Sequence, residues 1–294
     1  MNDYMIHAMA ANDEIRAYAI TAHDTVEYAR NAHETAPVVT AALGRMLMGT
    51  AMMGMMMQDD RDLITLQVRG DGPMQGITVT ADHLGHVKGF PMVSDVEVPP
   101  KYPGKLDVGA ALGQGFLRVM RDTGAPEPYV GTVDLMTGEI AEDLTYYFAQ
   151  SEQTPSAVGL GVLVDTDLTI RAAGGFLVQL MPGADEEMIG KLEDNIFLMD
   201  QLTTILDEDG TDAIFAQVLK GFEYHLVGEA PVGYRCYCSR ERVEEALSCI
   251  EERELQEMIG TGETVEVSCQ FCDARYAFTP DDLRALLPKE SEKK

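Results

Sequence analysis

Four cysteines near the C-terminal end of the chain form two close pairs. One residue separates Cys236 from Cys238, two separate Cys269 from Cys272, and thirty residues lie between the pairs. Four thiolates can hold a Zn²⁺ ion in a tetrahedron, and a small fold can bring two such pairs together. No histidine follows His225, so an all-sulfur site is the economical one. The sequence therefore predicts that Cys236, Cys238, Cys269 and Cys272 bind one zinc ion.

These pairs allow two interpretations. Zinc can serve purely as a staple, because a module of fewer than about 70 residues needs one for stability. However, the Cys-x-Cys spacing of the first pair departs from that of ordinary zinc fingers, and each pair is close enough in sequence to form a disulfide. Metal-bound sulfur is already thiolate, the form that oxidants attack, so oxidation would eject the metal. A structural staple and a redox switch both stay open on these residues alone.

The fifth cysteine, Cys249, lies outside the two pairs. On a helical wheel it flanks the apolar stripe of Val243, Ala246 and Leu247, which predicts a small, partly buried hydrophobic side chain. A resolving thiol is the alternative. The first 235 residues contain no cysteine, which argues against a disulfide framework spread through a secreted fold.

Motifs for other chemistry are missing from the sequence. It contains no Gly-x₄-Gly-Lys-[Ser/Thr] loop, and Gly113–Gln114–Gly115 lacks the third glycine of a dinucleotide fingerprint, so we expect no nucleotide cofactor. The six histidines show no metal spacing. The net charge of −27 disfavours nucleic-acid binding, which requires a basic surface. We expect a binding protein rather than an enzyme.

The N-terminal region predicts a cytoplasmic protein. It has no basic start followed by an apolar stretch, as a secretory signal would. The uncharged apolar run at 46–57 is too short to span a bilayer, so we expect no membrane segment. Seven methionines in this run favour a core helix, with a soft client-binding face or a target of oxidation as the alternatives.

The elements that must position the cysteines divide into three parts. Residues 1–182 alternate strand-like and helix-like patterns with many Gly and Pro turns, which predicts an α+β domain with a mostly antiparallel sheet. Residues 183–229 form an acidic helical linker, and residues 230–294 a small C-terminal module that binds zinc through four cysteines. Apolar residues make up 46% of the chain, enough for a sizeable core.

The linker has an apolar face that needs a partner. Apolar residues from Met188 to Leu206 keep helical spacing, which predicts one amphipathic helix, and a shorter helix follows at 211–220. The predicted packing face consists of Leu192, Ile196, Met199 and Leu202. Twelve acidic residues repel one another along the segment, so we expect this face to dock weakly on the N-terminal domain.

The cysteine pattern also resembles that of a known family. The segments CYCSRERVEEAL and VSCQFCDARYAF are similar to those of the 33 kDa chaperonin family, a redox-regulated bacterial heat-shock chaperone. The likeness extends through GEIAEDLTYYFAQSEQTPSAVGLGVLV, AAGGFLVQLMPGA and LQVRGDGPMQG, and so covers essentially the whole chain. It favours the redox switch over the staple.

The resemblance implies a mechanism. Reduced Cys236, Cys238, Cys269 and Cys272 bind zinc. On oxidation Cys236 pairs with Cys238 and Cys269 with Cys272, and the zinc leaves. The linker then unfolds, and the protein forms a homodimer that holds unfolding client proteins without ATP. Cysteines stand at all four positions of the family motif in this sequence. Cys249 lies outside the motif, so the resemblance gives it no role.

Two other functions remain as alternatives. Cys269 and Cys272 could act as the Cys-x-x-Cys of a thiol–disulfide oxidoreductase, although such a motif normally accompanies a βαβ pattern. A nucleic-acid-binding zinc ribbon is the second alternative. From Glu229 onward, nine Lys or Arg face fifteen Asp or Glu, which counts against it.

Overall fold

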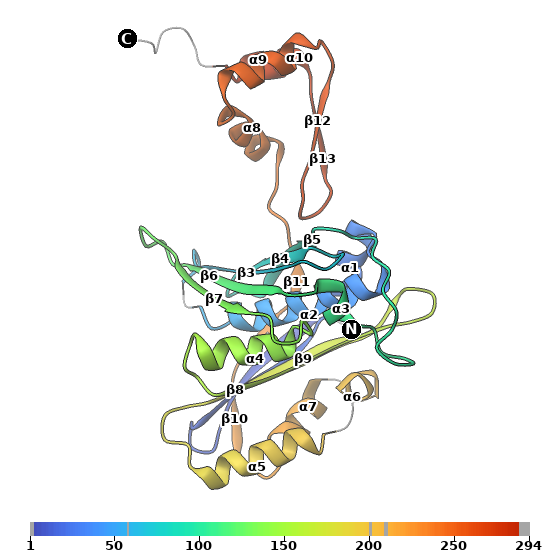
Figure 1. Cartoon of the computed structure of the whole chain (residues 1–294). Helices are drawn as coiled ribbons and strands as arrows, with labels where there is room; N and C mark the ends of the chain where they lie inside the picture. The colour runs from blue at the N-terminus through green and yellow to red at the C-terminus, as the bar shows by residue number, and fades with distance from the viewer. Residues whose placement is uncertain (1–2, 58, 200–201, 209–210, 288–294) are drawn as a thin grey trace. The chain divides into compact units, whose positions relative to one another are not determined.

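The computed structural model describes residues 3–57, 59–199, 202–208 and 211–287 (Figure 1). The chain divides into two compact units, with the boundary between Arg235 and Cys236. Residues 288–294 of the predicted C-terminal module lie outside the described residues.

Two sheets form the framework of the first unit. The five-stranded sheet has the order β10-β1-β2-β9-β8, with strands β1 (Tyr4–Ala10), β2 (Ile15–Thr21), β8 (Ser156–Val164), β9 (Ile170–Leu180) and β10 (Tyr224–Pro231). The six-stranded sheet has the order β11-β5-β4-β3-β6-β7, with strands β3 (Leu63–Gly70), β4 (Gly76–Ala81), β5 (His86–Pro91), β6 (Gly115–Asp122), β7 (Tyr129–Asp134) and β11 (Gly233–Tyr234). The strand pairs are antiparallel except for the short parallel pair β11–β5. The predicted α+β class with mostly antiparallel sheet is confirmed.

Helix α2 (Pro37–Gly54) lies between the two sheets (Figure 1). Almost every residue of it is buried, because strands cover it on both sides. It begins at Pro37, earlier than the sequence pattern predicts, since proline fits the first turn of a helix, where its missing N–H is not needed. Met46, Met48, Met52 and Met53 are at most 1% exposed, which favours the core interpretation of the methionine run.

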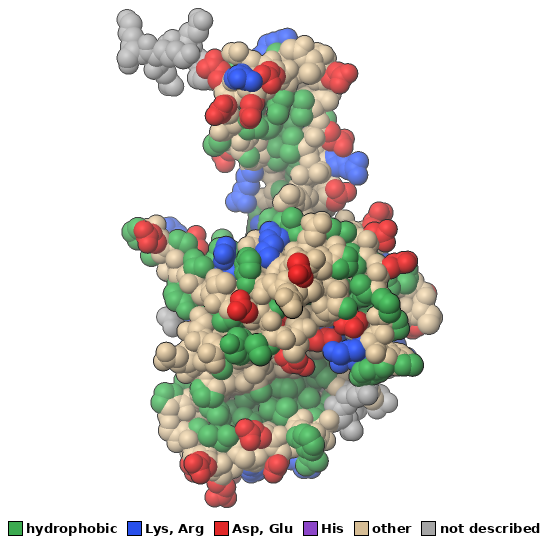
Figure 2. All heavy atoms as spheres, viewed as in Figure 1, with side chains coloured by type: hydrophobic (Ala, Val, Ile, Leu, Met, Phe, Trp, Pro, Cys, Tyr) green, Lys and Arg blue, Asp and Glu red, His purple; other side chains and the backbone are tan. Residues whose placement is uncertain are grey.

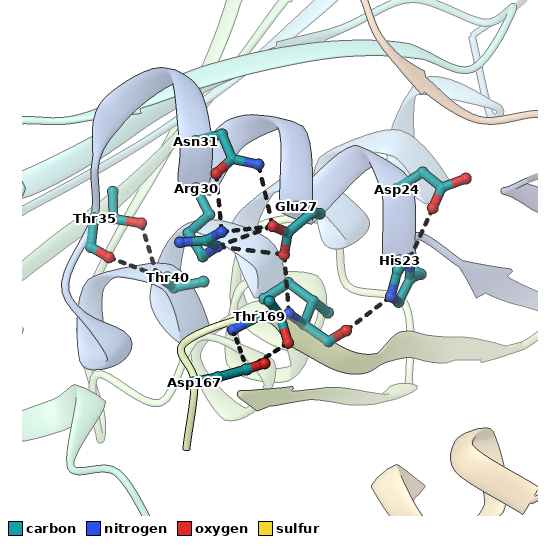
Figure 3. Close-up of polar contacts among 10 residues, drawn as sticks. His23, Asp24, Glu27, Arg30, Asn31, Thr35, Thr40, Asp167 and Thr169 are labelled. Atoms are coloured by element: carbon teal, nitrogen blue, oxygen red, sulfur yellow. Dashed lines mark hydrogen bonds and ion pairs between the residues drawn. The ribbon is translucent and has the colours of Figure 1, made fainter. Parts of the chain in front are cut away.

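Helix α1 (His23–His33) is held at its start by a buried carboxylate from outside the helix. Asp3 accepts hydrogen bonds from the backbone N–H of Thr25 at 2.6 Å and from its hydroxyl at 2.7 Å. The same helix is tied to the start of β9: His23 donates to the carbonyl of Ile170, and Glu27 accepts from the Ile170 N–H (Figure 3).

Helices α3 (Val108–Leu112) and α4 (Ala141–Gln150) complete the central part of the first unit. Asp143 in the first turn of α4 is fully buried. Its carboxylate accepts from the backbone N–H groups of Met136, Thr137, Gly138 and Ile140. This carboxylate therefore satisfies the donors of the loop that enters the helix.

The other face of the five-stranded sheet is covered by α5 (Glu186–Phe197), α6 (Leu202–Glu208) and α7 (Thr211–Val218). The prediction of one helix from Met188 to Leu206 is wrong, because α5 ends at Phe197 and α6 turns back onto β8 and β9. Glycines allow this close approach. A Cβ atom at Gly174 would lie 2.5 Å from Leu206 Cδ2, and one at Gly161 would lie 2.8 Å from Thr203 Cγ2.

The second unit is small and carries the cysteines. It consists of α8 (Arg240–Ser248), α9 (Glu252–Gly260), the hairpin β12 (Val265–Ser268) and β13 (Arg275–Phe278), and α10 (Pro280–Ala285). Its core contains four buried side chains, Leu247, Leu255, Phe278 and Leu283. Such a core is too small to stabilise a fold strongly without a further constraint.

The segment just before the cysteines belongs to the first unit. Strand β10 forms an edge of the five-stranded sheet, and β11 forms an edge of the six-stranded sheet. The contacts between residues therefore extend the first unit to Arg235. The predicted boundaries after residues 182 and 229 concern which parts of the chain act separately, and they stay a prediction.

Candidate metal centre

Two local structures present the four cysteine sulfurs. Cys236 and Cys238 lie in the segment before α8, whose start is capped by the Ser239 hydroxyl accepting from the Arg242 N–H. Cys269 and Cys272 lie in the turn between β12 and β13. There the Cys269 carbonyl accepts from the N–H groups of Cys272 and Asp273, and the Cys269 N–H donates to Ala274. The hairpin therefore fixes the second pair, and the helix cap fixes the exit of the first.

The fold brings these four sulfurs into one group. The Sγ atoms all lie within 4.8 Å of one another. Cys236 and Cys269 are 3.7 Å apart, and Cys238 and Cys272 are 3.3 Å apart. A tetrahedral zinc ion with Zn–S bonds of about 2.3 Å requires sulfurs about 3.8 Å apart. The donor set and the spacing therefore fit a tetrahedral thiolate-binding metal ion.

The surroundings of the sulfurs favour one thiolate even without a metal. Burial raises the pKa of the Cys236 and Cys272 thiols. Burial also opposes ionisation of Cys238, but hydrogen bonds from Tyr276 and the neighbouring cysteines outweigh it and lower the pKa of this thiol to about 7. Tyr276 keeps its proton, because donation to Cys238 raises the pKa of the phenol to about 12. Cys238 therefore loses its proton more readily than Cys236 or Cys272.

Comparison with known proteins identifies the family of this chain. The family model described as Hsp33 protein matches residues 3–279. The chain belongs to the Hsp33 family. It is 50% identical over 287 residues to the 33 kDa chaperonin of Agathobacter rectalis, covering 97% of this chain and all of that one. It is 46% identical to the 33 kDa chaperonin of Clostridioides difficile, covering 98% and 99% of the two chains.

A solved structure of the same family has the same fold. The crystal structure of the 33 kDa chaperonin (heat shock protein 33 homolog) of Thermotoga maritima superposes with a TM-score of 0.91 at 34% identity, covering 97% of this chain and 98% of that one. The resemblance seen in the cysteine segments is therefore confirmed. Hsp33 membership makes this chain a chaperone-family protein.

Cys249 stands apart from the metal centre of this Hsp33 chain. It is exposed and occupies the C-cap of α8, so the prediction of a partly buried side chain is wrong. The helix turns Leu247 into the core of the second unit, and Cys249, two residues later, falls on the solvent side. Within the described part of the chain, the four paired cysteines form the group that could hold a metal ion.

The predicted packing face of the linker lies on the first unit. Leu192 is buried, and Ile196, Met199 and Leu202 are partly buried. All four belong to one apolar cluster with side chains of β2, β9 and α7, including Ile15, Phe176 and Phe215. Acidic side chains of α5 point outward beside this apolar region (Figure 2). Leu192 is thus the one buried side chain of α5, and the helix is also held by hydrogen bonds from Asn195 to the carbonyls of Val218 and Lys220.

Two residues important to the Hsp33 site were missed by sequence reasoning. Tyr276 donates to Cys238, and Arg240 connects α8 with β13 and α10. Alternation in the segment RYAF places Tyr276 and Phe278 on one face of the strand, and this signal could have marked Tyr276 as inward-facing. Arg240 also pairs with Glu244 four positions later, but nothing local to it signals its partners on β13 and α10, which lie 37 and 42 positions away.

No helix in the described residues is long and apolar enough to cross a membrane.

Proposed function

We propose that this chain is a redox-regulated, ATP-independent holdase, which protects thermally unfolding and oxidatively damaged proteins from aggregation. The observation that carries the proposal is the group of four sulfurs within 4.8 Å of one another, in a unit with a core of four buried side chains. Family membership supplies the chaperone class. The redox control, the zinc and the clients are parts of the proposal.

In the reduced state Cys236, Cys238, Cys269 and Cys272 would hold one Zn²⁺ as thiolates. Bound zinc supplies a cross-link between the two pairs, worth about 10–16 kcal/mol of apparent binding energy in small zinc peptides. The Ser239 cap and the β12–β13 turn hold the two pairs for this cross-link. Because the core of the second unit is small, we expect its fold to depend on the site remaining intact.

Oxidation would remove the cross-link. A cysteine thiolate attacks peroxide to give a sulfenic acid and hydroxide, and the neighbouring thiol then displaces water to form the disulfide. The family resemblance assigns the disulfides to Cys236–Cys238 and Cys269–Cys272. Each closes a very short loop, so neither ties the two pairs to each other as the metal does. The second unit would therefore open.

Opening of the second unit would reach the linker through the chain. Strands β10 and β11 precede Cys236 directly and are edge strands with one partner each. The helices α5–α7 precede β10, and α5 has one buried side chain. A segment with few buried contacts opens at low free energy. Its Met, Leu, Ile and Phe side chains would then offer an adaptable surface for unfolded clients.

We further propose that the active form is an oxidised homodimer in the cytoplasm. Its partners would be unfolded polypeptides, and neither nucleic acid nor membrane would be among them. A net charge of −27 suits a chaperone that must stay soluble while its apolar surface is exposed.

Thiol–disulfide exchange catalysed by Cys269 and Cys272 is the alternative. Such catalysis needs a thiol of depressed pKa in the Cys-x-x-Cys motif. The depressed pKa falls on Cys238 of the other pair, and Cys269 and Cys272 lie in the turn of an antiparallel hairpin rather than beside a βαβ unit. This arrangement favours the holdase.

The test compares reduced and peroxide-treated protein in three measurements. We expect one zinc per reduced chain, loss of zinc on oxidation, and suppression of client aggregation only after oxidation. Hydrogen exchange should rise beyond about Gly183 and change little before it. Unchanged zinc in a Cys269→Ser variant, or catalysed insulin reduction without aggregation suppression, would contradict the proposal. Cys249→Ser serves as the control and should keep its zinc.

A further inference from the structure

Tyr276 connects the two halves of the cysteine site. It lies on β13 opposite Val267 of β12, and this hairpin carries Cys269 and Cys272. Its hydroxyl donates a hydrogen bond to Sγ of Cys238, 3.2 Å away and 38 positions earlier in the sequence. The bond therefore runs from the element that holds the second cysteine pair to a member of the first pair.

The chemistry of this contact suits a metal ligand. A phenol hydroxyl can donate to sulfur, and donation to a charged acceptor is stronger than donation to a neutral one. Cys238 must be thiolate to bind a metal, so ligand formation and the hydrogen bond favour each other. Groups that hydrogen-bond a ligand atom orient it and tune its electron density.

The ring of Tyr276 has a separate role. It packs, partly buried, against the small core formed by Leu247, Leu255, Phe278 and Leu283. Removal of the whole side chain would therefore disturb the fold as well as the sulfur. Removal of the hydroxyl alone separates the two effects.

We infer that Tyr276 is a positioning residue of the metal site, whose hydroxyl directs the Cys238 sulfur toward the other three and reduces its electron density. This inference rests on the proposed zinc site. It predicts that the hydroxyl increases the retention of metal by the reduced protein and makes Cys238 a weaker electron donor to the metal.

The first test measures metal affinity in the reduced full-length chain by chelator competition. Tyr276→Phe keeps the ring and removes the hydroxyl, and we expect it to bind zinc about 10-fold to 100-fold more weakly than wild type. Tyr102→Phe removes a hydroxyl from an exposed tyrosine of the first unit and serves as the control, with wild-type affinity expected. Equal affinity in wild type and Tyr276→Phe would overturn the inference.

The second test uses Co²⁺ in place of zinc, because its sulfur-to-cobalt charge-transfer band reports the electron density on the ligands. We expect the band of Tyr276→Phe at longer wavelength than that of wild type. Replacement of Tyr276 by 3-fluorotyrosine, a stronger donor, should move the band to shorter wavelength. A purely structural tyrosine would move it in neither case. Identical bands in wild type and the 3-fluorotyrosine protein would overturn the inference even if Tyr276→Phe lost its metal by unfolding.

The outcomes separate this inference from the proposed function. If the wild-type chain holds zinc and switches on oxidation while Tyr276→Phe is indistinguishable from it, the inference alone fails. If the reduced wild-type chain holds no stoichiometric zinc, the proposed function fails, and the inference fails with it.

Discussion

The guanidinium group of Arg240 lies 4.3 Å over the centre of the Phe278 ring. The same group donates to the Ala277 carbonyl at 2.7 Å and pairs with Asp282 at 3.1 Å. Arg240 belongs to α8, Phe278 to β13 and Asp282 to α10, so one side chain joins three elements of the second unit. It stands two residues after Cys238 and therefore links this core to the metal centre.

Arg240→Ala should loosen the second unit. The side chain is 39% exposed, so its ion pairs are screened, and we expect a loss of about 1 kcal/mol, mostly from the stacked ring and the backbone hydrogen bond. Hydrogen exchange of α8 and α10 in the reduced, metal-loaded chain measures it. Arg253→Ala, which removes an exposed pair with Glu257, is the control. Equal exchange in the two variants would contradict the bridging role of Arg240.

Removal of metal under reducing conditions should unfold the second unit, loosen residues 183–229 and spare the rest of the first unit. The second unit has four buried core side chains, whereas the core of the first unit extends over α2 and both sheets. Loss of the cross-link therefore removes most of the stabilisation from the second unit and none from the core of the first. Hydrogen exchange after chelation should increase beyond about Gly183 and stay unchanged in β3, β4 and α2. Protection of α8 and β12–β13 without metal would show that their core suffices.

Leu192→Ala should activate the reduced protein. Leu192 is the buried side chain of α5, and truncation of a buried leucine costs about 2–5 kcal/mol, enough to open a locally unfolding segment. The measurement is suppression of client aggregation by reduced protein, together with protease cleavage within α5. Phe197→Ala on the same helix is the matched control, because this side chain is 86% exposed. Increased cleavage without aggregation suppression would show that opening of the linker does not suffice.

Glu27 should make the first unit sensitive to acid. The hydrogen bond from Arg30 lowers the pKa of the Glu27 carboxyl below its ordinary value of 4.5, and the bond from the Ile170 N–H acts in the same direction (Figure 3). Because the pKa of this carboxyl is lower in the folded state than in the unfolded state, the ionised carboxylate stabilises the fold at pH values above the unfolded pKa. This stabilisation is lost as the pH falls through the folded pKa. Urea unfolding should therefore show wild type more stable than Glu27→Gln at neutral pH, with the difference shrinking below pH 4.5. A difference independent of pH would refute the role of the ionised carboxylate.

The sequence alone determined the elements that depend on neighbouring residues. The pairs Cys236–Cys238 and Cys269–Cys272 are short-range patterns. The apolar run of α2 likewise marked a core helix, because a segment with few polar residues has to be buried. The α+β class and the family followed from these patterns.

Only the tertiary structure decided where distant segments meet. The break between α5 and α6 follows from close packing on Gly161 and Gly174, although the apolar spacing continues without interruption. The contact of Tyr276 with Cys238 joins residues 38 positions apart, and the stacking of Arg240 on Phe278 joins residues of comparable separation. Helical spacing and caps reflect interactions within a few residues, whereas these contacts depend on how complete elements pack, and sequence periodicity carries no record of that packing.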